Sequence, residues 1–308
     1  MTDTQNEAFK TPANKIRLFE HGAPGSQNLK LTRKYYTEDM PDGRVKHIVQ
    51  NITDPDIVPY IPDGIGNSTD RQRIPAVLII PGGAFRRLVY NFEGEDVAKW
   101  LNSMGIAAFV LECRLPSDEH DNAEDVPLID AMRAMRVIRG RAQEFGIDEA
   151  KIGVMGFSAG GFMAALLSTA YESDVYADYK YKDEYDKLSA RPDFAVCSYP
   201  VISIDDCIEA GKRYMSEEQV LERISDSKAK ILHKYNPDKL VRPDMPPVFI
   251  CETDDDRTTL SENSVGFYMA ARKAGVSAEL HIFRTGGHGY GCGDDFAQTG
   301  EWKVLFTK

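Results

Sequence analysis

An apolar run in the middle of this chain leads into a serine flanked by glycines. Residues 152–157 are mostly apolar, and Gly156-Phe157-Ser158-Ala159-Gly160 has the pattern Gly-x-Ser-x-Gly ahead of an Ala- and Leu-rich segment. We interpret the stretch as a strand, a sharp turn and a helix, in which the glycines leave the space that a Cβ would fill. The helix N-terminus would offer backbone N–H groups to a developing negative charge. The pattern predicts that Ser158 is a nucleophile.

The alternative for this stretch is the glycine-rich turn of a nucleotide-binding α/β protein. That alternative is disfavoured because the chain contains neither Gly-x-Gly-x-x-Gly nor Gly-x-x-x-x-Gly-Lys-[Ser/Thr].

Apolar strand-like runs alternate with helical segments through most of the chain. Strands are expected at 76–80, 106–111, 194–201, 247–251 and 278–283, and helices at 97–104, 125–145, 160–170, 208–235 and 261–274. This alternation predicts an α/β fold, a mainly parallel sheet with helices on both faces and no large cap domain. We expect the helical segment 208–235 to cover part of the site.

The chain of 308 residues shows no linker in its middle, which favours one large domain. Residues 1–45 are polar and interrupted by prolines, so we expect an irregular N-terminal arm, followed by a catalytic domain over 46–308. A Tyr-rich polar insertion is expected near 171–186. Its tyrosines could stack on a sugar, or they could anchor a polar loop. Four arginines of the helix 125–145 are expected to face solvent: Arg133, Arg136, Arg139 and Arg141.

Charge and cysteine usage limit the partners and the compartment. The formal net charge of −11 argues against nucleic acid and anionic membranes as partners, because both repel an acidic surface. The five cysteines lack metal-site spacing and a disulfide framework, so we expect reduced core thiols. The N-terminal residues lack a signal-peptide pattern, and we expect a cytoplasmic protein without a membrane span. Whether the chain forms a homo-oligomer is left open.

The strand expected at 76–80 ends in Pro81-Gly82-Gly83-Ala84-Phe85, a loop in which backbone N–H groups can approach a ligand oxygen. Such a loop is an ordinary tight turn when it stands alone. Together with the serine turn downstream, it predicts an oxyanion hole formed by the N–H groups of Gly83, Ala84 and Ala159.

A serine nucleophile needs a base and an orienting acid. His288, in Gly286-Gly287-His288-Gly289, is the histidine whose glycine setting suits a mobile loop over the sheet edge. Asp254, Asp255 and Asp256 follow an apolar run between the serine and this histidine, and spacing alone does not choose among them. The order Ser…Asp…His places each group on a loop after a strand, where the three can meet.

From about Ala76 to Tyr290 the chain resembles the α/β-hydrolase esterases of the acetyl-xylan and feruloyl esterase type, relatives of the acetyl esterase and hormone-sensitive lipase group. The resemblance rests on several motifs: Pro81-Gly82-Gly83, residues 100–111 (Trp-Leu-Asn-Ser-Met-Gly-Ile-Ala-Ala-Phe-Val-Leu), residues 156–161, residues 189–194 (Ser-Ala-Arg-Pro-Asp-Phe), Glu262-Asn263-Ser264 and residues 286–289.

Those esterases carry a segment of the form Thr-x-x-Asp-x-x-Val-Pro-x-Glu-Asn-Ser. Aligned on Thr253 and residues 262–264, the resemblance implies that Asp256 is the catalytic acid. Thr259-Leu260 stands where the family has Val-Pro, so Asp255 stays as the alternative acid. Ala84 replaces a glycine of the oxyanion loop, but an alanine still donates its N–H.

These residues predict a serine carboxylesterase with the catalytic residues Ser158, Asp256 and His288, which needs neither a metal nor an organic cofactor. The resemblance implies a short acyl ester as substrate, with acetyl on a xylose-type oligosaccharide as the expected case. The alternatives are a peptidase or arylformamidase on the same fold and, as a different class, a binding protein that has kept the fold without catalysis.

Overall fold

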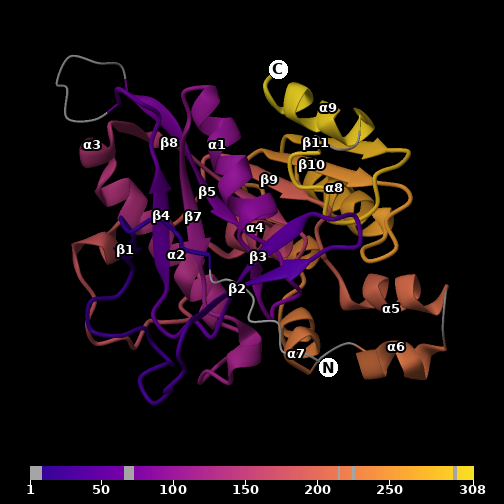
Figure 1. Cartoon of the computed structure of the whole chain (residues 1–308), viewed down its shortest axis with the longest axis horizontal. Coiled ribbons are helices and arrows are strands. Elements are labelled where there is room, and N and C mark those ends of the chain that lie inside the picture. The colour runs from indigo at the N-terminus through magenta and orange to yellow at the C-terminus, as the bar shows by residue number, and fades with distance from the viewer. Residues whose placement is uncertain (1–8, 66–72, 214–215, 224–225, 294–296) are drawn as a thin grey trace.

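A computed structural model describes residues 9–65, 73–213, 216–223, 226–293 and 297–308 (Figure 1). Within these residues the main sheet has eight strands in the order β1-β4-β7-β5-β8-β9-β10-β11. The strand β4 runs antiparallel to β1 and β7, and the other neighbours are parallel. The bounds are β1 Ile16–Arg17, β4 Asp56–Tyr60, β5 Ile74–Ile80, β7 Ala107–Glu112, β8 Ile147–Phe157, β9 Ala195–Ser198, β10 Val248–Thr253 and β11 Ala278–Phe283.

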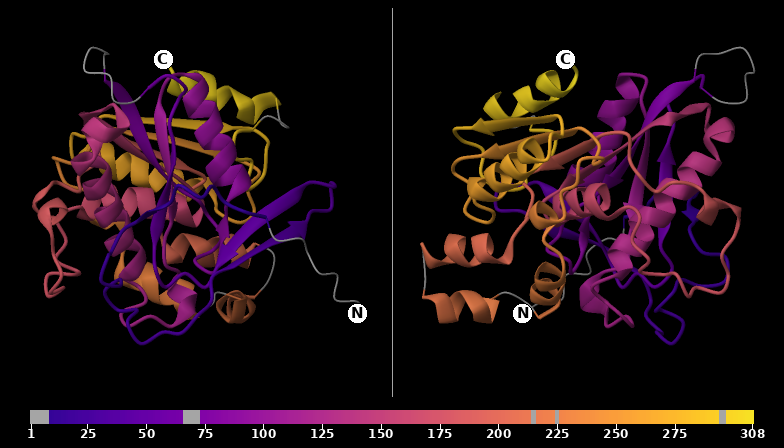
Figure 2. Two further views of the ribbon diagram at one scale, coloured as in Figure 1. Left: turned by 60° about the vertical axis from the view of Figure 1, so that its left-hand side comes forward. Right: turned by 180° about the vertical axis from the view of Figure 1, so that it is seen from behind.

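Helices cover both faces of this sheet, as the alternation of the sequence predicts (Figure 2). Helix α1 (Asp96–Ser103) and α9 (Ala297–Phe306) lie on one face, where Trp100 and Trp302 meet edge to face at 5.0 Å. Three helices pack on the opposite face: α2 (Val126–Gly140), α4 (Ala159–Ala170) and α8 (Ser261–Lys273). Helix α4 is buried almost throughout because it lies between the sheet and α2, which explains why its sequence is apolar on every side. The remaining α-helices in the described part of the chain are shorter: α3 Ala142–Phe145, α5 Ile204–Lys212, α6 Glu217–Arg223 and α7 Asp226–Lys234.

A small second sheet joins the strands β2 (Lys34–Asp39), β3 (Val45–Gln50) and β6 (Leu88–Val89). Strands β2 and β3 form a hairpin that projects from the body (Figure 2, left). The expectation of an irregular arm over 1–45 is therefore wrong for 16–17, 34–39 and 45, while its first eight residues lie outside the described part of the chain. Strand β2 is only partly buried, and it is held mainly by pairing with β3 and by Tyr35, which packs against the core, so its sequence lacks a clear apolar pattern.

The expectation that four arginines of the helix at 125–145 face solvent is wrong for Arg133, Arg136 and Arg139, which are largely buried. Arg141, at the end of α2, pairs with Glu144 at the surface. The segment 171–193 passes over this helix face and accepts its charges. Arg133 is buried and donates to Asp183 at 2.7 Å, and it forms an ion pair with Asp186 at 3.1 Å. Arg136 donates to the Leu188 carbonyl at 3.0 Å. These arginines hold a later segment of the chain against the body.

The Tyr-rich segment 171–186 behaves as an anchored polar loop. Tyr171 and Tyr176 are buried, and the hydroxyl of Tyr179 donates to the Gly22 carbonyl at 2.9 Å. None of these tyrosines lines the cavity that contains Ser158. Their aromatic rings therefore serve packing between distant segments.

The carboxyl ends of the parallel strands meet at one edge of the sheet, and the predicted site residues follow those ends. In the described part of the chain, no helix combines the length and the apolar character that crossing a bilayer requires. All five cysteines are buried, and none of them forms a disulfide.

Candidate active site

Ser158 lies at the sharp turn between β8 and α4. Its backbone has φ 54° and ψ −117°, a conformation that residues other than glycine rarely adopt. The turn is closed so tightly that a Cβ on Gly156 would lie 2.0 Å from the Gly160 carbonyl oxygen, and one on Gly160 would lie 1.9 Å from the Ile80 oxygen. Both glycines are therefore required for the turn that presents the serine hydroxyl.

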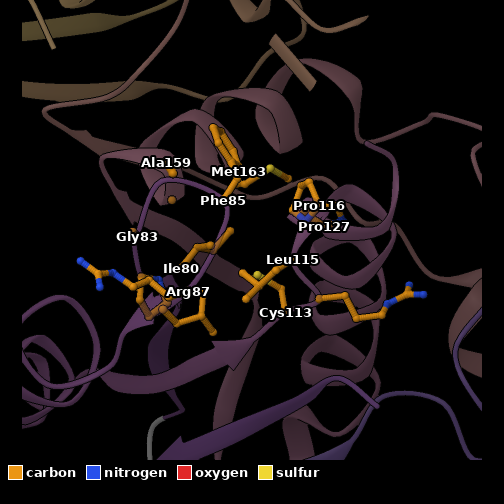
Figure 3. A pocket seen from close by; sticks show the side chains of 15 residues that line it. Ile80, Gly83, Phe85, Arg87, Cys113, Leu115, Pro116, Pro127, Ala159 and Met163 are labelled. Atoms are coloured by element: carbon orange, nitrogen blue, oxygen red, sulfur yellow. The ribbon is translucent and has the colours of Figure 1, made fainter. Parts of the chain in front are cut away.

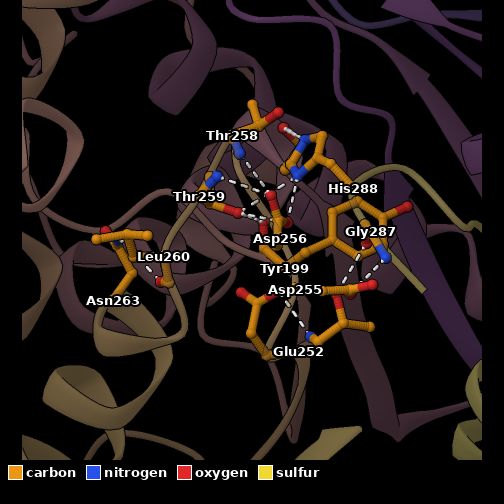
Figure 4. Close-up of polar contacts among 12 residues, drawn as sticks. Tyr199, Glu252, Asp255, Asp256, Thr258, Thr259, Leu260, Asn263, Gly287 and His288 are labelled. Atoms are coloured by element: carbon orange, nitrogen blue, oxygen red, sulfur yellow. Dashed lines mark hydrogen bonds and ion pairs between the residues drawn. The ribbon is translucent and has the colours of Figure 1, made fainter. Parts of the chain in front are cut away.

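The serine, the histidine and one aspartate form a continuous hydrogen-bonded row. His288 Nε2 lies 2.8 Å from Ser158 Oγ, and His288 Nδ1 lies 2.6 Å from Asp256 Oδ2 (Figure 4). The neighbouring Asp255 instead accepts the Gly287 N–H at 2.8 Å, so it shapes the histidine loop without touching the imidazole. Among the three consecutive aspartates, the structure thus brings Asp256 to the histidine.

Asp256 is held in its charged form by several donors. It accepts the N–H groups of Thr258 at 2.7 Å and Thr259 at 3.0 Å through Oδ1. Burial alone would raise the pKa of this carboxyl, but the hydrogen bond and the charge of His288, with the two backbone donors, hold the pKa below its ordinary value. A charged Asp256 can orient the Nδ1–H of His288 and leave Nε2 free to accept a proton.

The loop after β5 has an unusual backbone. Gly83, Ala84 and Phe85 have φ values of 139°, 56° and 61°, so three successive residues lie in the left-handed half of conformational space. A Cβ on Gly83 would lie 2.0 Å from the Arg87 carbonyl oxygen, which excludes any other residue there. Gly83 and Ala84 line the same cavity as Ser158.

Ala159 begins α4, where the first N–H groups of a helix have no acceptor within the helix. The structure therefore gathers Gly83, Ala84 and Ala159, the three predicted oxyanion donors, around Ser158.

The sequence and the architecture of this site have close counterparts. Residues 65–270 match the BD-FAE family. The acetylxylan esterase of Xylanibacter ruminicola is 31% identical over 223 residues, which is 72% of this chain and 42% of that protein.

The chain belongs to the BD-FAE esterase family.

Crystal structures agree with the BD-FAE assignment. The acetyl ester-xyloside bifunctional hydrolase of Caldicellulosiruptor lactoaceticus is 34% identical, with a TM-score of 0.70 over 95% of this chain and 93% of that one. An esterase of Thermogutta terrifontis with propionate bound is 25% identical, with a TM-score of 0.62 over 92% and 93% of the two chains. The α/β-hydrolase fold and the esterase resemblance predicted from the sequence are confirmed, while the chain spans less than half of the curated acetylxylan esterase.

The loop after β5 lines two cavities in this BD-FAE site. One, of about 20 Å³, is bounded by Gly83 and Ala159 and otherwise has mostly apolar walls, which include Phe85, Leu115 and Met163 (Figure 3). The other, of about 270 Å³, contains Ser158 and His288. Among the described residues of the segment 208–235, none lines the larger cavity, so this part of the predicted helical segment does not cover the site there. Helix α7 packs against the turn at Pro116–Asp118, and its Lys234 donates to Asp125 at 2.7 Å.

Glu93 is a site residue that the sequence analysis missed. Its side chain is buried, and it accepts the Gly82 N–H at 2.8 Å and the Tyr199 hydroxyl at 2.9 Å. Burial raises the pKa of this carboxyl, and the nearby charge of His288 opposes that rise. Nothing in local spacing indicates this role, because Glu93 reaches the loop only after the chain has turned back through β6.

Two further neighbours of Asp256 were not predicted. Thr259 Oγ1 lies 3.0 Å from Asp256 Oδ2. The feature of the sequence that could have indicated this contact is a threonine at a position where related esterases have valine. Glu252 is buried below the same aspartate, accepts from Ser264 Oγ at 3.2 Å, and has its pKa raised by burial and by the Asp256 charge (Figure 4). Among the described residues, no cluster of His, Cys, Asp or Glu side chains is arranged to hold a metal ion.

Proposed function

We propose that this BD-FAE protein is a serine carboxylesterase that removes short acyl groups, acetyl above all, from xylo-oligosaccharides or similar sugars. The observation that carries the proposal is the row Ser158, His288 and Asp256, with contacts of 2.8 and 2.6 Å, set beside the N–H groups of the loop after β5. Such a row activates a hydroxyl that is otherwise a poor nucleophile.

In the proposed reaction, Ser158 Oγ attacks the acyl carbonyl carbon while its proton moves to His288 Nε2. The carbonyl oxygen becomes an oxyanion, which the N–H groups of Gly83, Ala84 and Ala159 stabilise. The tetrahedral intermediate collapses as the C–O bond to the alcohol breaks, and His288 returns the proton to the leaving oxygen. A water molecule, deprotonated by His288, then attacks the acyl-enzyme and releases the carboxylic acid and Ser158. Asp256 holds the imidazole tautomer throughout.

The small cavity supports a short acyl group. Its volume of about 20 Å³ suits a group of the size of a water molecule or a methyl, and its walls are mostly apolar. An acetyl methyl group directed there would leave the alcohol in the larger cavity. A sugar as the alcohol is supported by the relatives named as acetylxylan esterase and acetyl ester-xyloside hydrolase. We place the enzyme in the cytoplasm, where reduced thiols such as those of its five buried cysteines persist.

The test is hydrolysis of 4-nitrophenyl acetate, butyrate and octanoate, with acetate release from an acetylated xylo-oligosaccharide alongside. Ser158→Ala is expected to lower kcat by at least about 10⁴-fold. Ser168→Ala is the matched control, because that hydroxyl lies in α4, the helix that follows Ser158, and donates to the Ala164 carbonyl at 2.7 Å. If the wild-type protein cleaves an arylformamide or a peptide and leaves all esters intact, the chain is an amide hydrolase and the proposal fails.

A further inference from the structure

The larger cavity has a cationic wall, although the whole chain is acidic. Four of the side chains that line it are basic: Arg44, Lys46, Arg86 and Arg87. The chain has 37 Lys and Arg against 48 Asp and Glu. Four basic side chains around one cavity therefore contrast with the acidic composition of the chain as a whole. The same cavity contains Ser158 and His288, so this charge acts where a substrate would bind.

Two of these cations have carboxylate partners. Arg87 pairs with Glu38 at 2.5 Å, and Arg44 pairs with Asp42 at 2.8 Å. Lys46 and Arg86 have no ion pair within the described ranges of the chain. Lys46 lies opposite Glu38 in the register of β2 and β3, but that carboxylate is taken by Arg87.

The carboxylates nearest the cavity do not cancel the remaining charge. Glu93 is buried and engaged by the Gly82 N–H and the Tyr199 hydroxyl, although it feels the charge of Lys46. Asp256 is occupied by His288, and Asp255 accepts the Gly287 N–H. Lys46 and Arg86 are therefore left to attract a ligand.

Both cations rest on well-fixed backbone. Lys46 belongs to β3, which is paired along its whole length with β2. The N–H of Arg86 donates to the Gly83 carbonyl at 3.2 Å, and its own carbonyl accepts from Gln50 at 3.1 Å. Arg86 thus stands two residues after the oxyanion donor Ala84, on a loop tied to the small sheet.

We infer that Lys46 and Arg86 bind a negatively charged group on the alcohol part of the substrate, and that the preferred substrate is a short-acyl ester of an acidic sugar, one that bears a uronic-acid carboxylate. This inference rests on the proposed esterase function. The small apolar cavity takes the acyl group, so the charge must belong to the part in the larger cavity. A carboxylate suits this wall because the fork of Arg86 can bind both of its oxygens while Lys46 adds a compact charge.

The experiment compares acetate release from two sugars that differ only in charge: a monoacetylated methyl glucuronoside and the corresponding uronamide. The wild-type enzyme is expected to have a higher kcat/KM for the acid, by about two- to fivefold for each cation. This ratio should fall as sodium chloride is added, because salt screens exposed charges. Lys46→Gln and Arg86→Gln are each expected to lower the ratio, and the double variant to bring it close to one.

Arg272→Gln is the matched control, because Arg272 is an exposed arginine in the last turn of α8 that does not line the cavity. It should leave the ratio at the wild-type value. A wild-type ratio of one or less, or a ratio that both cavity variants leave unchanged, overturns the inference. Preference for an acetylated glucose 6-phosphate over the uronate overturns the assignment to a carboxylate. Hydrolysis of 4-nitrophenyl acetate by the same preparations tests the esterase proposal separately, since that ester carries no anionic group.

Discussion

Oε2 of Glu93 accepts a hydrogen bond from the Gly82 N–H at 2.8 Å, so a buried carboxyl group holds the residue next to the proposed oxyanion donor Gly83. The two residues are closely packed, since a Cβ on Gly82 would lie 2.7 Å from the same oxygen. The other oxygen of Glu93 accepts from Tyr199, which ties the loop to the end of β9. The position of the oxyanion loop therefore depends on a residue that does not touch the proposed reacting atoms.

The first prediction concerns this contact. Glu93→Ala should lower kcat about 10- to 100-fold with a smaller change in KM, because displaced donors stabilise the oxyanion less well; loss of a whole donor costs roughly 10²–10³-fold. Steady-state kinetics with 4-nitrophenyl acetate measure both constants. Glu95→Ala is the control, since Glu95 stands on the same segment and pairs only with Lys99 at 2.9 Å. Equal kcat values for the two variants would show that Glu93 has no positioning role.

The second prediction separates the two neighbouring aspartates. Asp256→Asn should lower kcat by about 10⁴-fold, because the amide NH₂ can donate to Nδ1 and hold the imidazole in the wrong tautomer, and because the negative charge that stabilises the imidazolium is lost. Asp255→Asn should cost less than about tenfold, since an amide oxygen can still accept the Gly287 N–H. The kinetics are read at a pH where both variants are folded by circular dichroism. A larger loss in Asp255→Asn would reverse the assignment of the acid.

The third prediction tests Thr259 through pH. Its hydroxyl lies 3.0 Å from Asp256 Oδ2 and 3.3 Å from the Tyr199 carbonyl. The backbone N–H groups of Thr258 and Thr259 help to hold the pKa of Asp256 below its ordinary value. The Thr259 hydroxyl is a further donor to the charged form, so removing it should raise that pKa. In Thr259→Val, kcat/KM should therefore begin to fall at a higher pH as the solution is acidified. Thr259→Ser keeps the hydroxyl and should follow the wild-type pH profile; identical profiles for all three proteins would exclude the effect.

The fourth prediction concerns stability and the buried Glu252. Burial and the charge of Asp256 raise its pKa well above the ordinary value of 4.5, so folding favours the protonated form. Its stabilising contribution is then fully present below about pH 4.5 and is lost as the pH rises through the folded-state pKa. Relative to Glu252→Gln, which stays neutral, the wild-type protein should lose free energy of unfolding between pH 5 and pH 8, by at most about 1.4 kcal/mol for each pH unit.

Urea unfolding at both pH values measures this difference. Glu262→Gln is the control, because Glu262 is exposed at the start of α8 and pairs with Arg213 at 2.7 Å. A difference between wild type and Glu252→Gln that does not change with pH would show that Glu252 is charged at both.

The site could be predicted to the extent that local chemistry fixes it. The turn at Ser158 needs glycines at set positions, and His288 stands in a glycine loop, so both are readable along the chain. The contacts of Glu93 and Thr259 were not readable, because each depends on where a loop returns in space. The choice of Asp256 over Asp255 came from resemblance, since only the docked loop shows which carboxylate faces the imidazole.

The arginines of α2 show that prediction of the fold from the sequence has the same limit. A helical pattern identifies the face turned away from the sheet, but it does not reveal whether a later segment covers that face. Here the segment 171–193 does so, and Arg133 is left with only 5% of its side chain exposed, between Asp183 and Asp186. Asp186 is itself only 8% exposed, and without Arg133 the cation left beside it would be Arg136, at the longer distance of 3.9 Å.

The last prediction follows from that burial. Arg133→Met should lower the free energy of unfolding by about 2–4 kcal/mol, because breaking a buried ion pair leaves the Asp186 carboxylate with only the more distant charge of Arg136 to compensate it. Arg141→Met is the control: Arg141 pairs with Glu144 at the surface, where such pairs contribute about 0–1 kcal/mol. Urea unfolding followed by circular dichroism compares the two. Equal losses would mean that the segment 171–193 is held by its tyrosines, such as Tyr176 and Tyr179, and that the charges on α2 contribute little to its docking.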